Sequence, residues 1–282
     1  MPVPKLSMNF LLWPIGRKRV VLRWWCGFLI PWAALSIHII LFAFIVTWKI
    51  KKGEWVVSDP LVIPQNVTLI IPEGTTLKFS SDSALIAKGA VIIQGTKDLP
   101  VTLAGLRKKE YWQGIVVLNS LKTSTWSHAK ISYTSGINQN GWELTGGVTF
   151  YESDIEMNNI HFLGNHTEDA LNIVRSNFKL KNVTIENTLS DAFDSDFSKG
   201  KVETSFFQNI GSKGGGDGID ASGSDVVVSK TKFLNISDKA LSVGENSNMR
   251  ANEINIKAAD IAAATKDGSR LYLSNSILTG KL

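Results

Sequence analysis

Cysteine and N-terminal acidic side chains are what this sequence most lacks. Cys26 is the only cysteine among 282 residues, which excludes an intrachain disulfide framework and a zinc site built from several thiolates. Residues 1–52 contain no Asp or Glu, yet they hold eight of the 30 Lys and Arg residues. The rest of the chain therefore carries 22 basic and 25 acidic side chains. Because that part has no net positive charge to attract phosphates, we expect no nucleic-acid partner.

The longest apolar run extends from Cys26 to Trp48. These 23 residues contain no Lys, Arg, Asp or Glu, and a helix of this length can cross a hydrocarbon layer about 30 Å thick. A cleaved signal peptide has a shorter apolar region that ends in small residues, so an uncleaved anchor is favoured. The sequence predicts a basic cytoplasmic segment at 1–25, a transmembrane helix at 26–48 and a linker at 49–57.

The charges that flank this run predict its orientation. Four basic residues precede it, Arg17, Lys18, Arg19 and Arg23, and three follow it, Lys49, Lys51 and Lys52. By the positive-inside rule, the small excess before the run places the N-terminus on the cytoplasmic side of the cytoplasmic (inner) membrane. We therefore expect a single-pass protein whose C-terminal domain is extracytoplasmic.

The second half of the chain repeats with a period near 22 residues. Successive units begin at Asp169, Asp191, Asp217, Asp238 and Asp260, with spacings of 22, 26, 21 and 22. A serine recurs later in each unit, followed by short apolar runs: Ser176, Ser198, Ser224, Ser247 and Ser269. Several short strands in each unit are typical of a parallel β-helix. We predict an all-β domain at 58–282, a right-handed parallel β-helix of about ten coils with Asn and Asp at its corners.

Several of these segments resemble a known family. They are Leu144–Asp154, Glu168–Ser176, Ser190–Ser198, Asp217–Ser224 and Asp238–Glu245. They are similar to the right-handed β-helix region of bacterial envelope proteins that often also carry a CotH-like kinase domain. The kinase part is absent from these 282 residues, so the resemblance implies a fold and a cell-envelope setting and no phosphotransfer.

The candidate site is a group of carboxylates on neighbouring units. Alignment of the repeats places Asp191 over Asp217 and Asp194 over Asp220, and adjacent coils bring such side chains within about 5 Å. Asp196 and Glu245 belong to the same candidate ligand-binding group. Later units align Leu241 and Ala263 with Asp194 and Asp220, so these acids depart from the repeat and are the better functional candidates.

Three roles remain open for this group. Asp194, Asp196 and Asp220 are candidate catalytic residues of a polysaccharide hydrolase or lyase. Asp194 and Asp220 are a candidate Ca²⁺ pair that bridges an acidic sugar, since Ca²⁺ prefers oxygen ligands; no other cofactor is expected. A non-catalytic polysaccharide groove would use aromatic stacking platforms, for which the candidates are Trp112, Trp126, Tyr133 and Trp142.

A structural explanation competes with all three roles. Asp191, Asp217, Asp238 and Asp260 recur at unit starts, as corner residues that cap the turn backbone would. Arg175, Arg250 and Lys239 are expected to border the same face. His161 and His166 are spaced closely enough for a metal site, although loop histidines with other partners are the simpler interpretation.

The preferred hypothesis is a membrane-anchored β-helix that binds or guides an envelope or secreted polysaccharide, either alone or as part of a membrane complex. The alternatives are a structural scaffold and a polysaccharide lyase or hydrolase. Membrane-protein partners would contact either the span at 26–48 or the edge of the last coil, which ends without an obvious polar cap.

Overall fold

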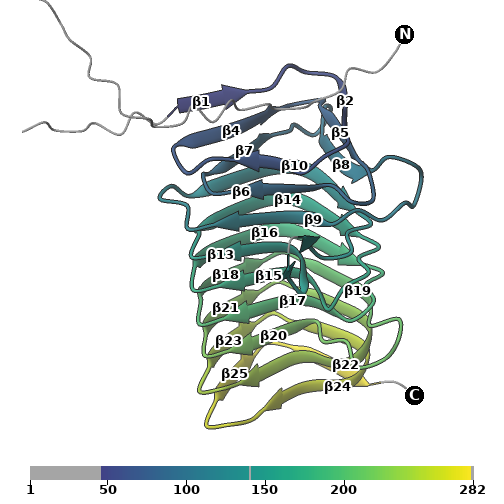
Figure 1. Ribbon diagram of the computed structural model, residues 1–282. Coiled ribbons are helices and arrows are strands. Elements are labelled where there is room, and N and C mark those ends of the chain that lie inside the picture. The colour runs from purple at the N-terminus through teal and green to yellow at the C-terminus, as the bar shows by residue number, and fades with distance from the viewer. Residues whose placement is uncertain (1–45, 140, 281–282) are drawn as a thin grey trace, which may run out of the picture.

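A computed structural model describes residues 46–139 and 141–280 as a stack of coils (Figure 1). Its strands run parallel in three ladders, and each coil contributes to the ladders in turn, which defines a parallel β-helix of about ten turns. The described residues contain no helix. The all-β prediction and the coil number are confirmed for this part of the chain, while the right-handed sense stays a prediction.

Ladder A carries the candidate site. Its strands, in stacking order, are β3 (Leu61–Ile63), β6 (Ala84–Ala87), β9 (Gly114–Leu118), β13 (Gly146–Tyr151), β15 (Asp169–Val174), β17 (Asp191–Asp196), β20 (Ile219–Ser222), and the later parts of β22 (Lys232–Gly244) and β24 (Asn255–Thr265).

Ladders B and C complete the coil. Ladder B contains β1 (Val46–Lys49), β4 (Val67–Pro72), β7 (Val91–Gln94), β10 (Ser124–Ser132), β14 (Ile155–Leu163), β16 (Asn177–Glu186), β18 (Lys199–Glu203), β21 (Asp225–Ser229), β23 (Asn248–Asn252) and β25 (Arg270–Ser274). Ladder C contains β2 (Glu54–Val57), β5 (Thr76–Phe79), β8 (Val101–Gly105), β19 (Phe206–Ile210), β26 (Ile277–Gly280), the later parts of β10, β14 and β16, and the first parts of β22 and β24.

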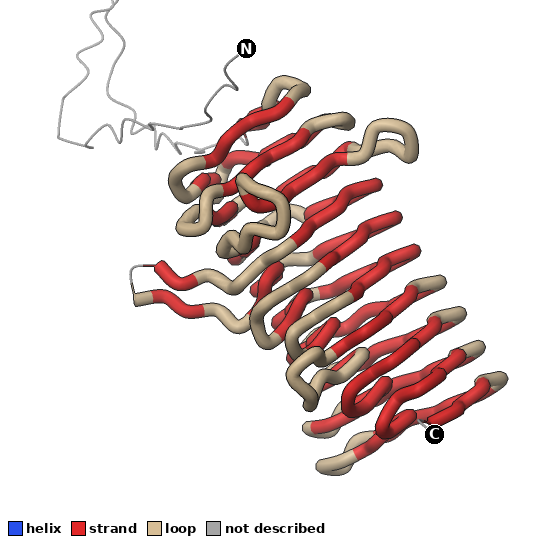
Figure 2. Tube along the Cα trace, turned by 90° about the vertical axis from the view of Figure 1, so that its right-hand side faces the viewer, coloured by secondary structure: helices blue, strands red, loops and turns tan. Residues whose placement is uncertain are grey.

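A small hairpin departs from this plan. Strands β11 (Asn138–Gln139) and β12 (Trp142–Glu143) pair antiparallel and project from the stack just before β13 (Figure 2). Ile137 and Leu144 at the hairpin base pack on Val116 of β9 in a second, small apolar cluster. The hairpin therefore covers the outer face of ladder A at β9 and stands beside the strands that follow.

The first coil begins earlier than the sequence predicts. Val46–Lys49 forms β1, in register with Val67–Ile70, and Trp48 packs against the core. The segment expected to be a linker at 49–57 contains β2, which pairs with β5. Alternating apolar residues that can stack on the next turn explain both strands. The remainder of the expected span, 26–45, and the basic segment 1–25 lie outside the described residues. Among the residues described, no helix has the length and apolar character needed to cross a membrane.

The recurring serines bind consecutive turns together. The backbone N–H of Ser176 donates to Ser198 Oγ (3.0 Å), that of Ser198 to Ser224 Oγ (2.9 Å), and that of Ser224 to Ser247 Oγ (2.8 Å). Ser247 N–H continues the series to Ser269 Oγ (3.1 Å). Each serine satisfies a donor where the ladder turns a corner, because a buried N–H without a partner is costly. This explains why serine recurs once in each unit.

Asparagines occupy another corner, as the sequence predicts. Asn182, Asn209 and Asn235 all have positive φ (52°, 53° and 57°), which Asn tolerates better than most residues. Asn235 Nδ2 also donates to Asn209 Oδ1 on the preceding turn (2.9 Å).

Candidate functional site

A row of polar side chains crosses five consecutive strands of ladder A. The ladder register aligns Asn172 with Asp194, Asp194 with Asp220, and Asp220 with Ser242. On the turn before Asn172 the aligned residue is Thr149, and on the turn before that it is the apolar Val116. We call these five residues the polar row: Thr149, Asn172, Asp194, Asp220 and Ser242. The prediction that Asp194 and Asp220 lie on adjacent coils is therefore confirmed.

The alignment of later units was wrong by one residue. Asp220 pairs with Ser242, and Ser242 with Ala264, whereas Leu241 and Ala263 continue the position of Ile219. The sequence alignment matched Asp238 with Asp217 as the start of a unit. In the structure the residue aligned with Asp217 on the next turn is Lys239, one position later. A slip of one residue in a strand exchanges its inward and outward faces. The polar row therefore extends one turn further than the sequence indicated.

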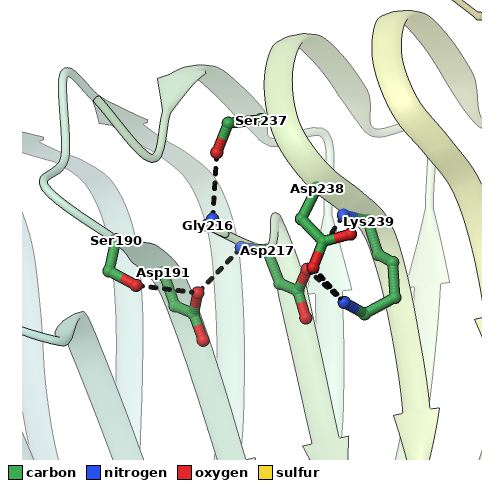
Figure 3. Close-up of polar contacts among 7 residues, drawn as sticks. All are labelled: Ser190, Asp191, Gly216, Asp217, Ser237, Asp238 and Lys239. Atoms are coloured by element: carbon green, nitrogen blue, oxygen red, sulfur yellow. Dashed lines mark hydrogen bonds and ion pairs between the residues drawn. The ribbon is translucent and has the colours of Figure 1, made fainter. Parts of the chain in front are cut away.

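Three more aspartates lie at or just before the start of β15, β17 and β20. Asp169 pairs in register with Asp191, and Ala192 N–H donates to Asp217 O (2.9 Å), which sets Asp217 beside Asp191. We call Asp169, Asp191 and Asp217 the acid corner. Figure 3 shows the Asp191 and Asp217 carboxyl groups side by side on neighbouring strands.

Two members of the acid corner cap the backbone of the next turn. Asp191 Oδ1 accepts the N–H of Asp217 (2.8 Å), and Asp217 Oδ1 accepts the N–H of Lys239 (2.9 Å). The Lys239 ammonium also contacts Asp217 Oδ1 (3.1 Å) and pairs with Asp238 (Figure 3). These bonds match the turn-capping explanation for Asp191 and Asp217. These bonds do not involve Asp194 or Asp220.

Burial and mutual repulsion raise the pKa values across this face. Burial is the largest cause in each case, and neighbouring carboxylates add to it. The pKa of Asp194 is raised to about 9, that of Asp169 to about 8 and that of Asp191 to about 7. The pKa values of Asp196 and Asp217 are also raised, although Asn172 and Lys239 oppose the shift. Some of these carboxyl groups therefore hold protons at neutral pH.

Asn172 and Ser242 are site residues that the sequence analysis missed. Asn172 Nδ2 donates to Asp194 Oδ2 (3.1 Å) and to Asp196 Oδ2 (3.2 Å), which joins the two carboxyl groups. Ser242 Oγ, Thr149 Oγ1 and Asp220 Oδ1 are buried and have no hydrogen-bond partner among the described residues. The repeat already aligned Asn172 with Asp194, whereas Ser242 falls in line with Asp194 and Asp220 only in the corrected register.

An exposed rim borders the polar row at the end of β15 and β17. The Arg175 guanidinium lies 5.4 Å from the ring centre of Phe197, and its Nη1 donates to Tyr151 Oη (3.0 Å). The Phe197 side chain is 56% exposed. It lies over Gly223 (φ +62°), where a Cβ atom would come within 2.6 Å of the ring. The prediction that Arg175 borders this face is therefore confirmed.

Two of the predicted aromatic stacking platforms, Trp112 and Trp126, are wrong. Trp112 and Trp126 are 0% and 1% exposed, because they fill the core, and Trp112 stacks on Phe79 with centroids 4.0 Å apart. Tyr133 is half-buried at a different corner, where it packs edge-on against Tyr111. Trp142 is 41% exposed on the hairpin that projects beside ladder A. It is the expected platform that remains available to a ligand.

The other candidates lie at the margins of this face or away from it. Glu245 is exposed and close enough to act on the charge of Asp196. Arg250 lies on ladder B, over the ring of Tyr272, and so does not border the site. His161 pairs with Glu186 (2.8 Å) and His166 packs on Tyr111, which separates the two histidines into different contacts.

The closest grouping of carboxylate oxygens differs from the predicted Ca²⁺ pair. One oxygen each from Asp191, Asp217 and Asp220 lie within 4.8 Å of one another. Asp194 is the register neighbour of Asp220 but is not a member of this group. This group joins two members of the acid corner, Asp191 and Asp217, to Asp220 of the polar row, and it is where this face can gather ligands for a cation.

Fold and site together define the class: a parallel β-helix with an acidic, partly aromatic outer face. The sequence matches no protein-family model. No curated protein matches it significantly.

Three solved structures are similar to this chain. One is the gp42 tailspike of Acinetobacter phage vb_AbaP_AS12, with 7% identity and a TM-score of 0.29 over 81% of this chain and 58% of that one. Another is the catalytic domain of a GH87 α-1,3-glucanase in complex with nigerose, with 10% identity and a TM-score of 0.29 over 83% and 60%. The third is an alginate lyase from a Paenibacillus strain, with 13% identity and a TM-score of 0.26 over 74% and 92%. The chain thus spans less than two thirds of the tailspike and the glucanase domain.

Proposed function

We propose that the outer face of ladder A binds an envelope or secreted polysaccharide, with the polymer running along the coil axis. The observation that carries this proposal is the polar row, which aligns one polar side chain on each of five consecutive turns. Asp194 and Asp220 are half-buried, whereas the other three side chains are buried. Turns of a β-helix are about 4.8 Å apart. A linear polymer of sugars that runs along the coil axis can therefore meet Asp194 and Asp220, the two half-buried members of the row, on successive turns.

The side chains on this face suit a ligand rich in hydroxyl groups. Asp194 and Asp196 offer carboxyl oxygens as hydrogen-bond partners, and Asn172 holds them in place. Trp142 at the hairpin and Phe197 at the rim expose aromatic faces, which pack against apolar ligand surface with little loss of side-chain entropy. Polar side chains between exposed aromatic rings give both specificity and buried area.

Aromatic truncation tests this proposal. We expect the full-length chain, purified in detergent, to bind a polysaccharide on a glycan array, with or without Ca²⁺. Trp142→Ala and Phe197→Ala should each weaken that binding at least about tenfold, equivalent to ~1.4 kcal/mol, as measured by isothermal titration calorimetry. Both side chains are exposed, so folding should be retained.

Tyr272→Ala is the matched control, because Tyr272 is 57% exposed on ladder B. It should leave the affinity unchanged. Absence of any glycan binding, or equal weakening by the control, would contradict the proposal.

A second candidate function is polysaccharide cleavage by Asp194, Asp196 and Asp220. The specific observation in its favour is that Asp194 has a raised pKa and lies beside Asp220 on the next turn. A carboxyl group that stays protonated near neutral pH can act as a general acid. Loss of turnover in Asp194→Asn, with the fold retained, would identify this chemistry.

We also propose that residues 26–45 hold the protein in the cytoplasmic membrane, with the β-helix outside the cytoplasm. The support is the apolar, uncharged sequence of this run, which ends where β1 begins, and the resemblance to CotH-associated envelope proteins. Resistance to alkaline extraction from membranes tests it, and release into the soluble fraction would contradict it.

A scaffold role would instead require membrane-protein partners, either at the span or at the last coil. Ile277 and Leu278 of β26 are exposed there. Stoichiometric partners that co-purify from native membranes would favour the scaffold over the glycan-binding hypothesis.

A further inference from the structure

The carboxyl group of Asp220 has less support from the protein than its neighbours have. Asp191 Oδ1 accepts a backbone N–H (2.8 Å), and Asp217 Oδ1 accepts both a backbone N–H and the Lys239 ammonium. Asp220 Oδ1, in contrast, is buried without a hydrogen-bond partner in the described part of the chain. A buried carboxylate oxygen without a donor is costly, so this position requires a group that the protein itself does not supply.

A second buried oxygen without a partner lies on the strand beside Asp220. Ser242 is fully buried, and its Oγ is also without a partner among the described residues. Ser242 is the register partner of Asp220 on the next strand of ladder A. Register partners in a parallel ladder project from the same face of the sheet. The hydroxyl oxygen of Ser242 is therefore aligned with the unsupported carboxyl group of Asp220.

The spacing of the carboxylates is compatible with one bound Ca²⁺ ion. The closest oxygens of Asp191, Asp217 and Asp220 lie within 4.8 Å of one another. Ca²⁺ binds oxygen at about 2.3–2.6 Å, so two ligands on opposite sides of the ion are about 4.6–5.2 Å apart. A single Ca²⁺ can therefore contact an oxygen of each residue without a change in the ladder.

We propose that Asp191, Asp217 and Asp220 bind one Ca²⁺ ion, with Ser242 Oγ supporting the site from the following turn. The Lys239 ammonium lies 3.1 Å from Asp217 Oδ1, so it competes with Ca²⁺ for this carboxylate. Ca²⁺ offsets the negative charge of these three carboxylates and binds two adjacent turns together. The site does not depend on polysaccharide binding, and it would allow this face to accept an acidic sugar that bare carboxylates repel.

Calcium titration of the full-length chain after removal of metal with EDTA tests this proposal. We expect isothermal titration calorimetry with CaCl₂ to show one ion per chain, with a dissociation constant of about 10⁻⁴–10⁻³ M, the range of extracellular modules. Saturating Ca²⁺ should raise the melting temperature by mass action. Asp220→Asn should weaken binding at least about tenfold, because it removes the ligand with the least support from the protein.

Two further variants sharpen the test. Lys239→Gln should tighten Ca²⁺ binding, because it removes the competing ammonium, and this gain does not require Asp220→Asn to fold. Asp225→Asn changes an exposed acid on ladder B and should leave the affinity unchanged. The proposal is overturned if the unaltered chain shows neither a heat of Ca²⁺ binding nor a shift in melting temperature. It is also overturned if Asp220→Asn binds Ca²⁺ as tightly as the unaltered chain, or if Lys239→Gln weakens Ca²⁺ binding. Because this titration contains no glycan, its failure is distinguishable from failure of the proposed function.

Discussion

Asp194→Asn is expected to raise the melting temperature of the protein at pH 8. The pKa of Asp194 is about 9 in the folded chain against an ordinary value of 3.8, because the group is buried beside Asp169, Asp196 and Asp220. Between these two values the folded state holds a proton that the unfolded chain releases. Stability is therefore fully present below about pH 4 and is lost progressively as the pH rises toward 9. Asparagine keeps the hydrogen-bonding shape and removes this cost.

The expected gain is at least ~1 kcal/mol at pH 8, or roughly 3 °C for a chain of this size. At pH 4, close to the ordinary pKa of 3.8, the two proteins should differ little in melting temperature, since the carboxyl group is then protonated in the folded chain and only partly ionised in the unfolded chain. Thermal melts followed by circular dichroism from pH 4 to pH 9, in EDTA, measure the difference.

Asp225→Asn, at an exposed position on ladder B, is the control and should show no such pH-dependent gain. An Asp194→Asn protein that melts lower at pH 8 would show that the carboxylate stabilises the fold. The same variant separates the functional hypotheses, because a binding protein keeps part of its affinity whereas a hydrolase or lyase loses turnover.

Phe207→Ala is expected to destabilise the coil by about 3–5 kcal/mol, as truncation of a buried phenylalanine does. Phe207 and its register partner Phe233 are buried and stack in the core with centroids 5.0 Å apart and an interplanar angle of 8°. Each turn of a β-helix contacts only the turns beside it, so the cavity has few neighbours that can move to fill it. Urea denaturation followed by circular dichroism gives the free energy of unfolding.

Phe197→Ala removes the same side chain from the exposed rim and serves as the control. We expect it to cost less than about 1 kcal/mol, in the range of surface substitutions. Equal losses in the two variants would contradict the assignment of ladder C residues to a continuous core.

The coil itself could be predicted from the sequence because its physics is local and repeated. Ser198 and Ser224 recur at the spacing of the turns and satisfy one corner donor each. The same spacing placed Asp194 beside Asp220, which the register confirms. A feature that every turn must solve leaves a periodic signal, and such a signal can be read without coordinates.

The parts that could not be predicted depend on single turns. Lys239 rather than Asp238 is aligned with Asp217 on the next turn. The sequence alignment was therefore displaced by one residue there, and Ser242 was missed. Trp112 and Trp126 look like ligand platforms in sequence, yet their indole rings fill the core. The hairpin that carries Trp142 belongs to no repeat, so no periodicity could place it beside the acidic face.

Hydroxyl-radical footprinting of the full-length chain tests the central claim most directly. The polysaccharide that binds most tightly on the array is added, and oxidation of exposed aromatic residues is followed by mass spectrometry. The account predicts protection of Trp142 and Phe197, with Tyr272 on ladder B oxidised as in the free protein. Protection of Tyr272 with Trp142 and Phe197 unchanged would show that the ligand binds elsewhere and would contradict the claim that ladder A is the binding face.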